Sequence, residues 1–463
     1  MIGDAHPLRN AIALLHDPVT PEKRRILEER WSTLSPGVKL PTQGLGQKAT
    51  GCGATIGIQP RCDFACTGCY LGDEANKIPA LSTEMILRQL DELRRYLGPK
   101  SNVQITDGEV TLRPEEELIE ILRYARSIGI VPMVMTHGDN LRRKPGLLER
   151  LMTKGLLTEI SIHIDITQRG RDGYKSPKDE NELMPLREEF ANMIRSARHT
   201  TGRRLRAAMT FTVTQQNLPQ MADVSRWLIA NRDAFSLVSF QPLAQVGRTR
   251  KSLSGVTPEE LWTEIGKALE SYGTKLPNAN PMQFGHPECT RFVPFIAVEE
   301  KKGKPKLMQL IRDNDSDRTL LERYMKTGLA GIAFRDDLPI ELVARGAGML
   351  RHSPRFFLGQ ARRWLSGKVQ QEYGYGLTTL AAKILSRKVK LDGFTFTSHH
   401  FMSPLELDTQ LGKERLDACV FRLPVNGEML PMCQVNAGGV RERFYAAIPE
   451  VPAHLPERPA ASN

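Results

Sequence analysis

The sequence predicts an α/β protein built around a parallel sheet, and two patterns within residues 54–272 indicate this fold class. Short apolar segments typical of strands alternate with longer segments in which apolar residues recur at helical spacing. All but one of the helical segments begin at Ser, Thr or Pro, and two of them end at Gly98 and Gly129. Strands separated by helices favour a parallel sheet, either open or closed into part of a barrel. In such sheets the functional residues lie where the strands lead into loops.

The expected elements follow one another from the N-terminus. A helix over Thr20–Trp31 begins with a Thr cap followed by Pro21. Strands are then expected at 54–59, 103–106, 130–136, 159–165, 205–214 and 236–241. Helices are expected between and after them at 82–97, 114–127, 147–154, 185–199, 219–231 and 257–272.

The alternation stops near residue 286. Strands at 292–299 and 306–310, a basic helical region over 315–390 and a β segment around 394–397 are expected next. Asn426-Gly427 predicts a hairpin between 419–425 and 428–434. The Pro- and Ala-rich end of the sequence is expected to be disordered. We therefore divide the chain into an N-terminal extension (1–51), an α/β domain (52–285), a C-terminal region (286–448) and a tail (449–463).

The composition excludes several classes of protein. With 40% hydrophobic and 25% charged residues, the chain is typical of a folded protein. It has no run of about 18 apolar residues that could span a membrane, and Met1–His6 lacks a secretory signal pattern, so we expect a cytoplasmic protein. The 64 Lys and Arg residues exceed the 53 Asp and Glu residues by 11. This excess fits nucleic acid, an anionic membrane surface or an anionic substrate, and charge alone does not choose among them.

Three of the seven cysteines stand within eight residues, in Cys62-Asp63-Phe64-Ala65-Cys66-Thr67-Gly68-Cys69. Three thiolates from one loop can bind one metal centre and leave a coordination position open for another ligand. The loop follows the first expected strand, where α/β proteins hold their sites. The alternatives are a structural zinc site with a ligand from elsewhere and a chance cluster.

This Cys-x3-Cys-x2-Cys loop and its position resemble those of the radical S-adenosylmethionine (SAM) enzymes. The resemblance covers about residues 52–285 and implies that Cys62, Cys66 and Cys69 bind a 4Fe-4S cluster whose open iron binds SAM. Reductive cleavage of SAM then yields a 5′-deoxyadenosyl radical, which abstracts hydrogen. An electron donor such as flavodoxin or ferredoxin is the expected partner. The implied fold is a partial (β/α)6 radical SAM barrel with a short N-terminal extension and a mixed α+β C-terminal region.

The ends of later strands supply the other residues that this resemblance implies for SAM. Thr106-Asp107-Gly108-Glu109 resembles the Gly-Gly-Glu motif that holds the amino group of SAM, with Asp107 replacing the first Gly. A buried ion pair with Arg169 is the alternative role for Asp165. The family usually has a bulky residue before the last cysteine, where this chain has Gly68, so adenine packing is expected from Phe64 or Tyr70. The cofactor-binding residues expected are Asp107, Gly108, Glu109, Thr136, His137, Asp165, Gln168, Arg169, Gln241 and Tyr70.

The other four cysteines equal the number that one auxiliary 4Fe-4S cluster needs; they are Cys52, Cys289, Cys419 and Cys433. The turn at Asn426-Gly427 brings two of them, Cys419 and Cys433, within one step of register, so we expect these two side by side. Cys52 is the least obvious ligand, and a histidine (His286, His399 or His400) could replace it. The alternative is a set of scattered, buried free thiols.

Segments of the C-terminal region resemble the tetraether-synthase-like branch of radical SAM proteins, which couples lipid chains. They are His399-His400-Phe401-Met402 and Arg415–Cys433, and the sixth expected strand, 236–241, shares this resemblance. This resemblance implies hydrogen abstraction from an unactivated C–H bond of a lipid chain and C–C bond formation, the work of a transferase or oxidoreductase in lipid biosynthesis. The first alternative is radical modification, including methyl transfer, of a peptide, nucleoside or pterin-like small molecule. The second is a non-catalytic iron–sulfur or zinc protein that binds a partner.

A basic stretch from Leu342 to Gln371 contains no Asp or Glu. Its expected helix begins at Ser353-Pro354 and places apolar residues on one face: Phe357, Ala361, Trp364 and Leu365. An apolar face flanked by arginines fits peripheral association with the inner membrane surface. The alternative is a helix packed on the core with its basic face in water. Nucleic acid is disfavoured as a partner, because bulky aliphatic residues interrupt the basic ones and no RNA-binding motif accompanies them.

Overall fold

The computed structural model describes residues 7–51, 54–276, 280, 282–300, 305–329 and 339–447. The tail expected at 449–463 and Cys52 lie outside the described residues.

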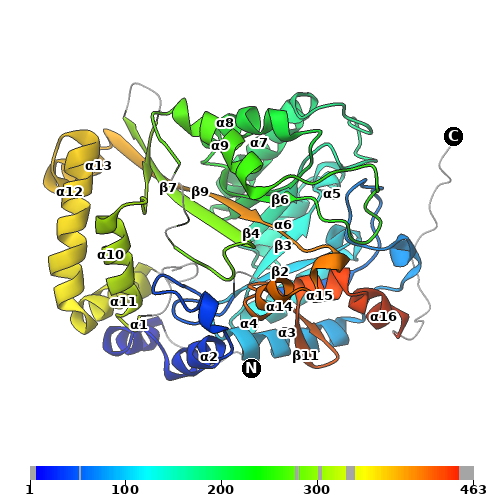
Figure 1. The fold of residues 1–463 in the computed structure, drawn as a ribbon, viewed down its shortest axis with the longest axis horizontal. Helices are drawn as coiled ribbons and strands as arrows, with labels where there is room; N and C mark the ends of the chain where they lie inside the picture. The colour runs from blue at the N-terminus through cyan, green and yellow to red at the C-terminus, as the bar shows by residue number, and fades with distance from the viewer. Residues whose placement is uncertain are drawn as a thin grey trace.

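A nine-stranded sheet forms the centre of the molecule, in the order β1-β2-β3-β4-β5-β6-β9-β7-β8 (Figure 1). Its first six strands are parallel, and each pairs with the next along the chain. Such consecutive order requires every crossover to run in the same direction, so the helices collect on one face and the sheet curves as part of a barrel. The predicted partial barrel is therefore confirmed. The six strands are β1 (Ala54–Gln59), β2 (Asn102–Asp107), β3 (Val131–Thr136), β4 (Glu159–His163), β5 (Arg206–Val213) and β6 (Phe235–Pro242).

The helices between these strands agree closely with the sequence expectation. Ser82 caps α3 by accepting a hydrogen bond from the Met85 amide, and Thr257 and Glu260 form a capping box at α9. One short helix, α5 (Asp139–Arg143), was not expected. The others are α2 (Pro21–Ser32), α3 (Thr83–Leu97), α4 (Glu115–Ser127), α6 (Leu147–Thr153), α7 (Met184–Thr201), α8 (Met221–Ala230) and α9 (Pro258–Glu270).

Three strands of the C-terminal region extend the same sheet across residue 285. β9 (Val389–His399) pairs parallel with β6 and is much longer than the segment expected at 394–397. β7 (Thr290–Glu300) runs antiparallel between β9 and β8 (Lys306–Gln309). The open edge of β6 is thus paired, which satisfies backbone groups that would otherwise face solvent.

The remaining helices lie at the periphery. α1 (Pro7–His16), which was not expected, packs against α11 (Pro339–His352) at the lower left of Figure 1. The basic region continues with α10 (Asp315–Met325), the π-helical η6 (Arg355–Ala361), α12 (Arg362–Tyr373) and α13 (Leu377–Leu385). The chain then forms α14 (Gln410–Asp417), α15 (Met432–Ala437) and α16 (Val440–Ala446). The short 3-10 helices are Pro36–Val38, Asp73–Lys77, Val110–Leu112, Asn181–Leu183, Leu218–Gln220 and Pro404–Glu406.

The predicted hairpin turn at Asn426-Gly427 is confirmed, with Val425 opposite Glu428. Both turn residues have positive φ, 50° and 84°, as a tight hairpin turn of this kind requires. However, β10 (Arg422–Val425) and β11 (Glu428–Pro431) are shorter than expected. Pro431 directly precedes α15, so Cys433 lies in a helix, and Cys419 lies before β10. The expected strand as far as Gln434 is therefore wrong.

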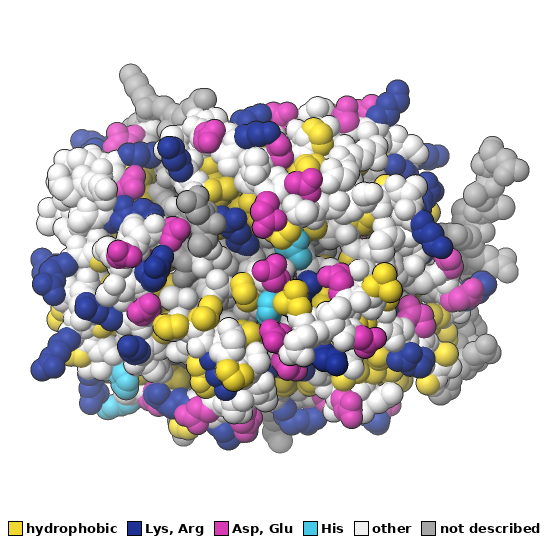
Figure 2. All heavy atoms as spheres, viewed as in Figure 1, with side chains coloured by type: hydrophobic (Ala, Val, Ile, Leu, Met, Phe, Trp, Pro, Cys, Tyr) yellow, Lys and Arg dark blue, Asp and Glu magenta, His cyan; other side chains and the backbone are white. Residues whose placement is uncertain are grey.

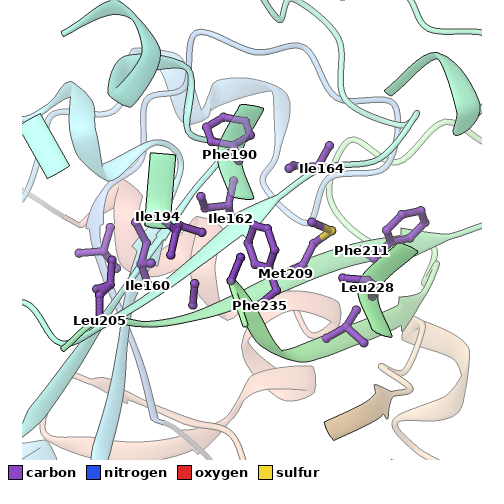
Figure 3. Packing of buried hydrophobic residues seen from close by; sticks show 14 of the residues in the cluster. Ile160, Ile162, Ile164, Phe190, Ile194, Leu205, Met209, Phe211, Leu228 and Phe235 are labelled. Carbon is purple, nitrogen blue, oxygen red and sulfur yellow. The ribbon is translucent and has the colours of Figure 1, made fainter. Parts of the chain in front are cut away.

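The core between the sheet and its outer helices shows which strand residues face the barrel interior. Ile160 and Ile162 of β4 point towards Phe190 and Ile194 of α7 (Figure 3). Because side chains alternate along a strand, the intervening residues face the opposite side. Ser161 and His163 accordingly line the interior cavity, as Thr210 and Thr212 of β5 do.

Most of the apolar face expected to lie on a membrane packs against the α10 cluster instead: Phe357, Ala361 and Trp364 have partners there, whereas Leu365 is 36% exposed. The Trp364 indole donates a 2.7 Å hydrogen bond to Asp317 of α10, and Lys368 donates to the Leu310 carbonyl at 2.9 Å. Phe356 is buried against Leu321 and Tyr324 in the same cluster. Aromatic and basic residues on this face find partners within the protein, so its apolar character reflects packing.

The surface near these helices is rich in positive charge. Lys and Arg side chains gather at the left edge of the molecule, where Figure 1 has α12 (Figure 2). Among the described residues, none of the helices combines the length and apolar character needed to cross a bilayer.

Candidate active site

A cavity of about 1300 Å³, counting its open mouth, lies at the C-terminal ends of the barrel strands. The cysteine loop forms one wall, the strand ends form the floor, and residues of α15 reach it from the C-terminal region. Of the expected site residues that the structure describes, Asp165, Arg169, Cys289 and Cys419 do not line this cavity. Those that do are Cys62, Cys66, Cys69, Tyr70, Asp107, Gly108, Glu109, Thr136, His137, Gln168, Gln241 and Cys433.

The cysteine loop is held by backbone hydrogen bonds to the segment after β4. The Ala65 amide donates to the Arg169 carbonyl at 3.0 Å, and the Thr67 amide donates to the Thr167 carbonyl at 2.8 Å. At the start of the loop, the Cys62 amide donates to the Asn76 side chain at 2.9 Å. These contacts turn all three thiols towards one cavity without a regular element in the loop itself.

The three thiols lie where a negative charge is costly unless a cation offsets it. Burial, and then the proximity of Cys69, raises the pKa of Cys66 to about 12. Burial and the nearby Cys66 also raise the pKa of Cys62 well above its ordinary value. Arg248 faces all three thiols, and their proximity raises its pKa although burial opposes this. Three convergent thiols beside a guanidinium fit a 4Fe-4S cluster, because its iron ions favour the thiolate form.

Gly68 allows the strand-six loop to approach the cysteine loop closely. A Cβ at this position would lie 2.5 Å from Leu243 Cδ1, so any side chain would displace Leu243. Leu243 thus fills the space that a bulky residue before the last cysteine would take. This explains how the chain accommodates Gly at that position.

The Asp107-Gly108-Glu109 turn is built into the site by backbone and side-chain contacts. The Gly108 amide donates to the Gln59 carbonyl at 2.7 Å, and a Cβ on Gly108 would lie 2.3 Å from the Arg61 carbonyl oxygen. Glu109 is fully buried; it accepts hydrogen bonds from Thr136 Oγ1 at 2.7 Å and from the His137 amide at 2.9 Å. The carboxylate therefore ties the end of β3 to the end of β2.

His137 and Phe64 form one unit between the cysteine loop and β3. Their rings stack with centroids 3.7 Å apart and an interplanar angle of 3°. His137 Nε2 lies 2.8 Å from Asp63 Oδ1, and Asp63 also accepts a hydrogen bond from Arg143. Phe64 is buried in this stack, and Tyr70 donates its hydroxyl to the Asp107 carbonyl at 2.7 Å. Both aromatic residues considered for adenine packing are therefore already engaged with protein groups.

Asp165 pairs with His163 rather than with Arg169. It also accepts hydrogen bonds from the Thr167 and Thr212 amides, each at 2.7 Å. Burial works against its ionisation, yet the neighbouring His163 and these hydrogen bonds hold the pKa of Asp165 below its ordinary value. The alternative role considered for Asp165, an ion pair with Arg169, is wrong. The result is an oriented imidazole, His163, on the cavity wall.

Arg171 is a positioning residue that the sequence motifs did not indicate. Its buried guanidinium donates to the His137 carbonyl at 2.7 Å, to the His163 carbonyl at 3.0 Å and to Gln168 Oε1 at 2.6 Å. It thereby joins the ends of β3 and β4 and orients Gln168. Only the alternation of polar residues along β4 and β5 could have pointed to the neighbouring wall residues Ser161, His163, Thr210 and Thr212.

The C-terminal region contributes apolar residues to the main cavity. Phe401 and Met402 follow β9, and Met432 begins α15. They line the cavity together with Leu243, which follows β6, and with Cys433 and Asn436 of α15. The lining therefore mixes polar residues of the strand ends with apolar residues from distant segments.

Three of the four remaining cysteines gather at a second, smaller cavity. Cys289, Cys419 and Cys433 line it together with His399 and His400. Arg415 Nε donates to Cys289 Sγ at 3.2 Å, and the Met402 amide donates to Cys433 Sγ at 3.4 Å. Cys433 also lines the main cavity, so the two cavities share a wall. His286, another ligand considered, does not line the smaller cavity; it accepts from the Glu288 amide.

The family comparison matches residues 56–210 to a model described as the Radical SAM superfamily. A curated protein, 7,8-dihydro-6-hydroxymethylpterin dimethyltransferase of Methanocaldococcus jannaschii, is 23% identical over 202 residues. That match spans 43% of this chain and 38% of the relative's own length.

Solved structures give distant matches. The crystal structure of Streptococcus suis SuiB bound to S-adenosylmethionine has a TM-score of 0.36 and 16% identity, over 52% of this chain and 51% of that one. The FeFe-hydrogenase maturase HydG of Carboxydothermus hydrogenoformans has a TM-score of 0.36 and 14% identity, over 82% and 90% of the two chains. Similarity at this level carries no structural argument.

The matched segment contains Cys62, Cys66 and Cys69, the turn at Asp107–Glu109 and the ends of β3 and β4. The match implies a 4Fe-4S cluster and SAM as cofactors. The family match identifies residues 56–210 of this chain as a radical SAM domain.

Proposed function

We propose that this protein abstracts hydrogen from an unactivated C–H bond of a lipid hydrocarbon chain, using SAM as the radical source, and so prepares that chain for C–C bond formation. The observation that carries the proposal is the mixed lining of the main cavity, in which Phe401, Met402, Met432 and Leu243 accompany the polar residues of the strand ends. The resemblance of the C-terminal region to the lipid-coupling branch agrees with this substrate class.

The chain's own residues have distinct parts in this proposal. Cys62, Cys66 and Cys69 would hold the 4Fe-4S cluster, which when bound would supply the electron for reductive cleavage of SAM. The Asp107–Glu109 turn would bind the amino group of SAM through the Asp107 carbonyl and the Glu109 carboxylate, which also accept hydrogen bonds from Tyr70 and Thr136. Gln241 and Thr212 offer hydrogen-bonding groups on the polar wall.

The apolar residues that line the cavity suit a reaction through a carbon radical. A carbon radical reacts with whatever lies near it, so water and polar groups must be kept away from the reacting carbon. Met402 and Met432 have flexible, polarisable side chains that fit a hydrocarbon chain of varied shape. A lipid chain gains free energy by leaving water for such a surface, at roughly 25 cal/mol per Å² buried.

Isotope transfer tests this function. The protein is reconstituted anaerobically with iron and sulfide and given SAM, dithionite and lipids with perdeuterated acyl chains. We expect 5′-deoxyadenosine that carries deuterium, and none from Cys62→Ala, which lacks a cluster ligand. Formation of 5′-deoxyadenosine without deuterium in the presence of these lipids would rule out the acyl chain as the hydrogen source.

Methyl transfer to a pterin-like small molecule is the second candidate. The partial match to the Methanocaldococcus pterin dimethyltransferase favours it, and the polar groups Ser161, His163 and Thr210 could bind a heteroaromatic ring. SAM labelled on its methyl group, supplied with 6-hydroxymethylpterin, separates the candidates. Label in the pterin supports methyl transfer, whereas a pterin that stays unlabelled while 5′-deoxyadenosine forms excludes it.

A second 4Fe-4S cluster at Cys289, Cys419 and Cys433 is the proposed auxiliary cofactor. These thiols share one small cavity with His399 and His400. Burial raises the pKa of Cys289 to about 11, although Arg415, which donates to its sulfur, acts in the opposite direction. The fourth ligand is left to Cys52 or one of these histidines. Iron analysis decides: about eight iron atoms per chain, falling to about four in Cys419→Ala/Cys433→Ala, supports two clusters. About four atoms in both proteins contradicts the second.

A further inference from the structure

Asp107 has an unusual backbone conformation for its residue type. Its φ is 124°, a region that side chains other than glycine rarely adopt. The other non-glycine residues with positive φ in the described chain lie between 50° and 58°, in the ordinary left-handed region. A backbone of this kind persists only where surrounding contacts hold it in place.

Those contacts come from α16, more than 300 residues away in the sequence. Arg441 donates to Asp107 Oδ1 at 2.8 Å, and the Tyr445 hydroxyl donates to Asp107 Oδ2. All three side chains are buried, with about 5% of each residue exposed. Gly57 of β1 leaves room for the group, because a Cβ there would lie 2.7 Å from Asp107 Oδ2.

The same guanidinium reaches two further parts of the site. It donates to Asn436 Oδ1 through Nε at 3.0 Å, and Asn436 lines the main cavity from α15. It also lies 5.0 Å from the ring of Tyr70, whose hydroxyl donates to the Asp107 carbonyl. Arg441 itself does not line the cavity. Its contact with the site therefore runs through Asp107, Tyr70 and Asn436.

We propose that Arg441 is a positioning residue for SAM: it pairs with Asp107 and holds the Asp107-Gly108-Glu109 turn in the conformation that binds the cofactor's amino group. The C-terminal helix α16 thereby becomes part of the cofactor site. This inference rests on the proposed binding of SAM at that turn.

The ion pair between Arg441 and Asp107 also explains why an aspartate can stand where the family has glycine. Glycine adopts a φ of 124° at little cost and has no side chain to bury, whereas the buried carboxylate of aspartate needs hydrogen-bond donors. Removing Arg441 alone leaves a buried carboxylate without its cationic partner, with only the Tyr445 hydroxyl donating to it, on a strained backbone. Removing the carboxylate as well, by Asp107→Gly, eliminates both problems at once.

A double-mutant cycle tests the proposal. SAM affinity is measured by equilibrium dialysis on the reconstituted wild type, Arg441→Leu, Asp107→Gly and the double variant. We expect Arg441→Leu to weaken binding at least about tenfold and the double variant to recover most of this loss. Arg443→Leu, on the exposed side of the same helix, is the matched control and should bind as the wild type does.

Hydrogen exchange on the unreconstituted proteins gives a readout that needs no cofactor. The amides of Gly108 and Glu109 donate to the carbonyls of Gln59 and Arg61. They should exchange faster in Arg441→Leu and return towards the wild-type rate in the double variant. Arg441→Lys keeps the positive charge but loses the several N–H donors of the guanidinium, so we expect exchange rates between those of the wild type and Arg441→Leu.

Two results would overturn the inference. One is wild-type SAM affinity and exchange in Arg441→Leu. The other is a double variant that binds SAM no better than Arg441→Leu, since that outcome assigns Arg441 a role independent of Asp107. If the wild type binds no SAM, the proposed function fails, and exchange at Gly108 and Glu109 alone decides whether the pair holds the turn.

Discussion

Gly108 shows how a single residue type is required by a neighbouring backbone. The carbonyl oxygens of Pro60 and Arg61 would lie 2.4 Å and 2.3 Å from a Cβ at this position, and backbone atoms cannot move aside as a side chain can. The requirement comes from the close approach of the β1 and β2 ends. It is therefore a property of the site and not of the local turn alone.

Gly108→Ala should lower the free energy of unfolding by about 3 kcal/mol, because the added methyl group forces the two strand ends apart. Urea unfolding measures this. Gly367→Ala in α12 is the matched control, with no atom within 4 Å of the added Cβ. Since alanine favours a helix over glycine, this control should gain up to about 1 kcal/mol. Equal losses in both variants would contradict the close-approach argument.

Asp107 predicts a pH dependence of stability. Burial raises its pKa from 3.8 to about 6, although Arg441 acts in the opposite direction. The folded state then binds this proton more tightly than the unfolded state. The stabilising contribution is complete below about pH 4 and is lost as the pH rises through about 6. Asp107 faces Arg441 and Tyr445 of α16 and Tyr70 of the cysteine loop.

Relative to Asp107→Asn, the wild type should therefore lose about 2 kcal/mol of stability between about pH 4.5 and pH 7.5. Urea unfolding of both proteins at the two pH values measures the difference. A constant difference would mean that Asp107 does not change its protonation state in this range.

At the scale of elements, the helix that begins after Ser353 was predicted, but its orientation was not. Its spacing indicated one apolar face with Phe357, Ala361 and Trp364. An apolar face looks the same in sequence whether it contacts lipid or protein. Only the fold brings Asp317 of α10 within 2.7 Å of the Trp364 indole.

Trp364→Phe should cost about 2 kcal/mol of stability, because it leaves the buried Asp317 without the indole donor. Leu358→Ser is the control, since Leu358 is 58% exposed and should change stability by less than about 0.5 kcal/mol. Chemical denaturation of the two variants distinguishes the packed face from the exposed one. A larger loss in Leu358→Ser would reverse this assignment.

At the scale of the whole molecule, we propose that the edge formed by α1, α11, α12 and α13 associates with an anionic membrane surface. Exposed apolar residues stand here beside exposed arginines: Val343 is 73% exposed, Leu358 58% and Leu385 84%. Each basic residue near an anionic leaflet contributes about 1 kcal/mol. The proposal agrees with a lipid substrate, because a surface-bound enzyme can take up chains from the bilayer.

Sedimentation with anionic liposomes at low salt tests this association. Arg362→Glu/Arg363→Glu should reduce the bound fraction strongly, because it reverses two charges at the edge. Arg88→Glu/Arg123→Glu, on exposed positions of α3 and α4, changes the net charge equally and should bind as the wild type does. Equal effects of the two variants would assign binding to net charge, and no binding of the wild type would end the proposal.

The sequence by itself determined the alternating strands and helices of the α/β domain, the cysteine loop and the hairpin turn, and its resemblance to the radical SAM enzymes implied the partial barrel. These features depend on short-range signals: alternation of strand and helix periods, caps, thiol spacing and Asn426-Gly427. Contacts between distant segments were decided only by the tertiary structure. They include β9 beside β6, His163 paired with Asp165, Trp364 turned inwards, and Arg441 on Asp107. A buried charge or a strained backbone needs a partner, but nothing in the local sequence states where in the chain that partner lies.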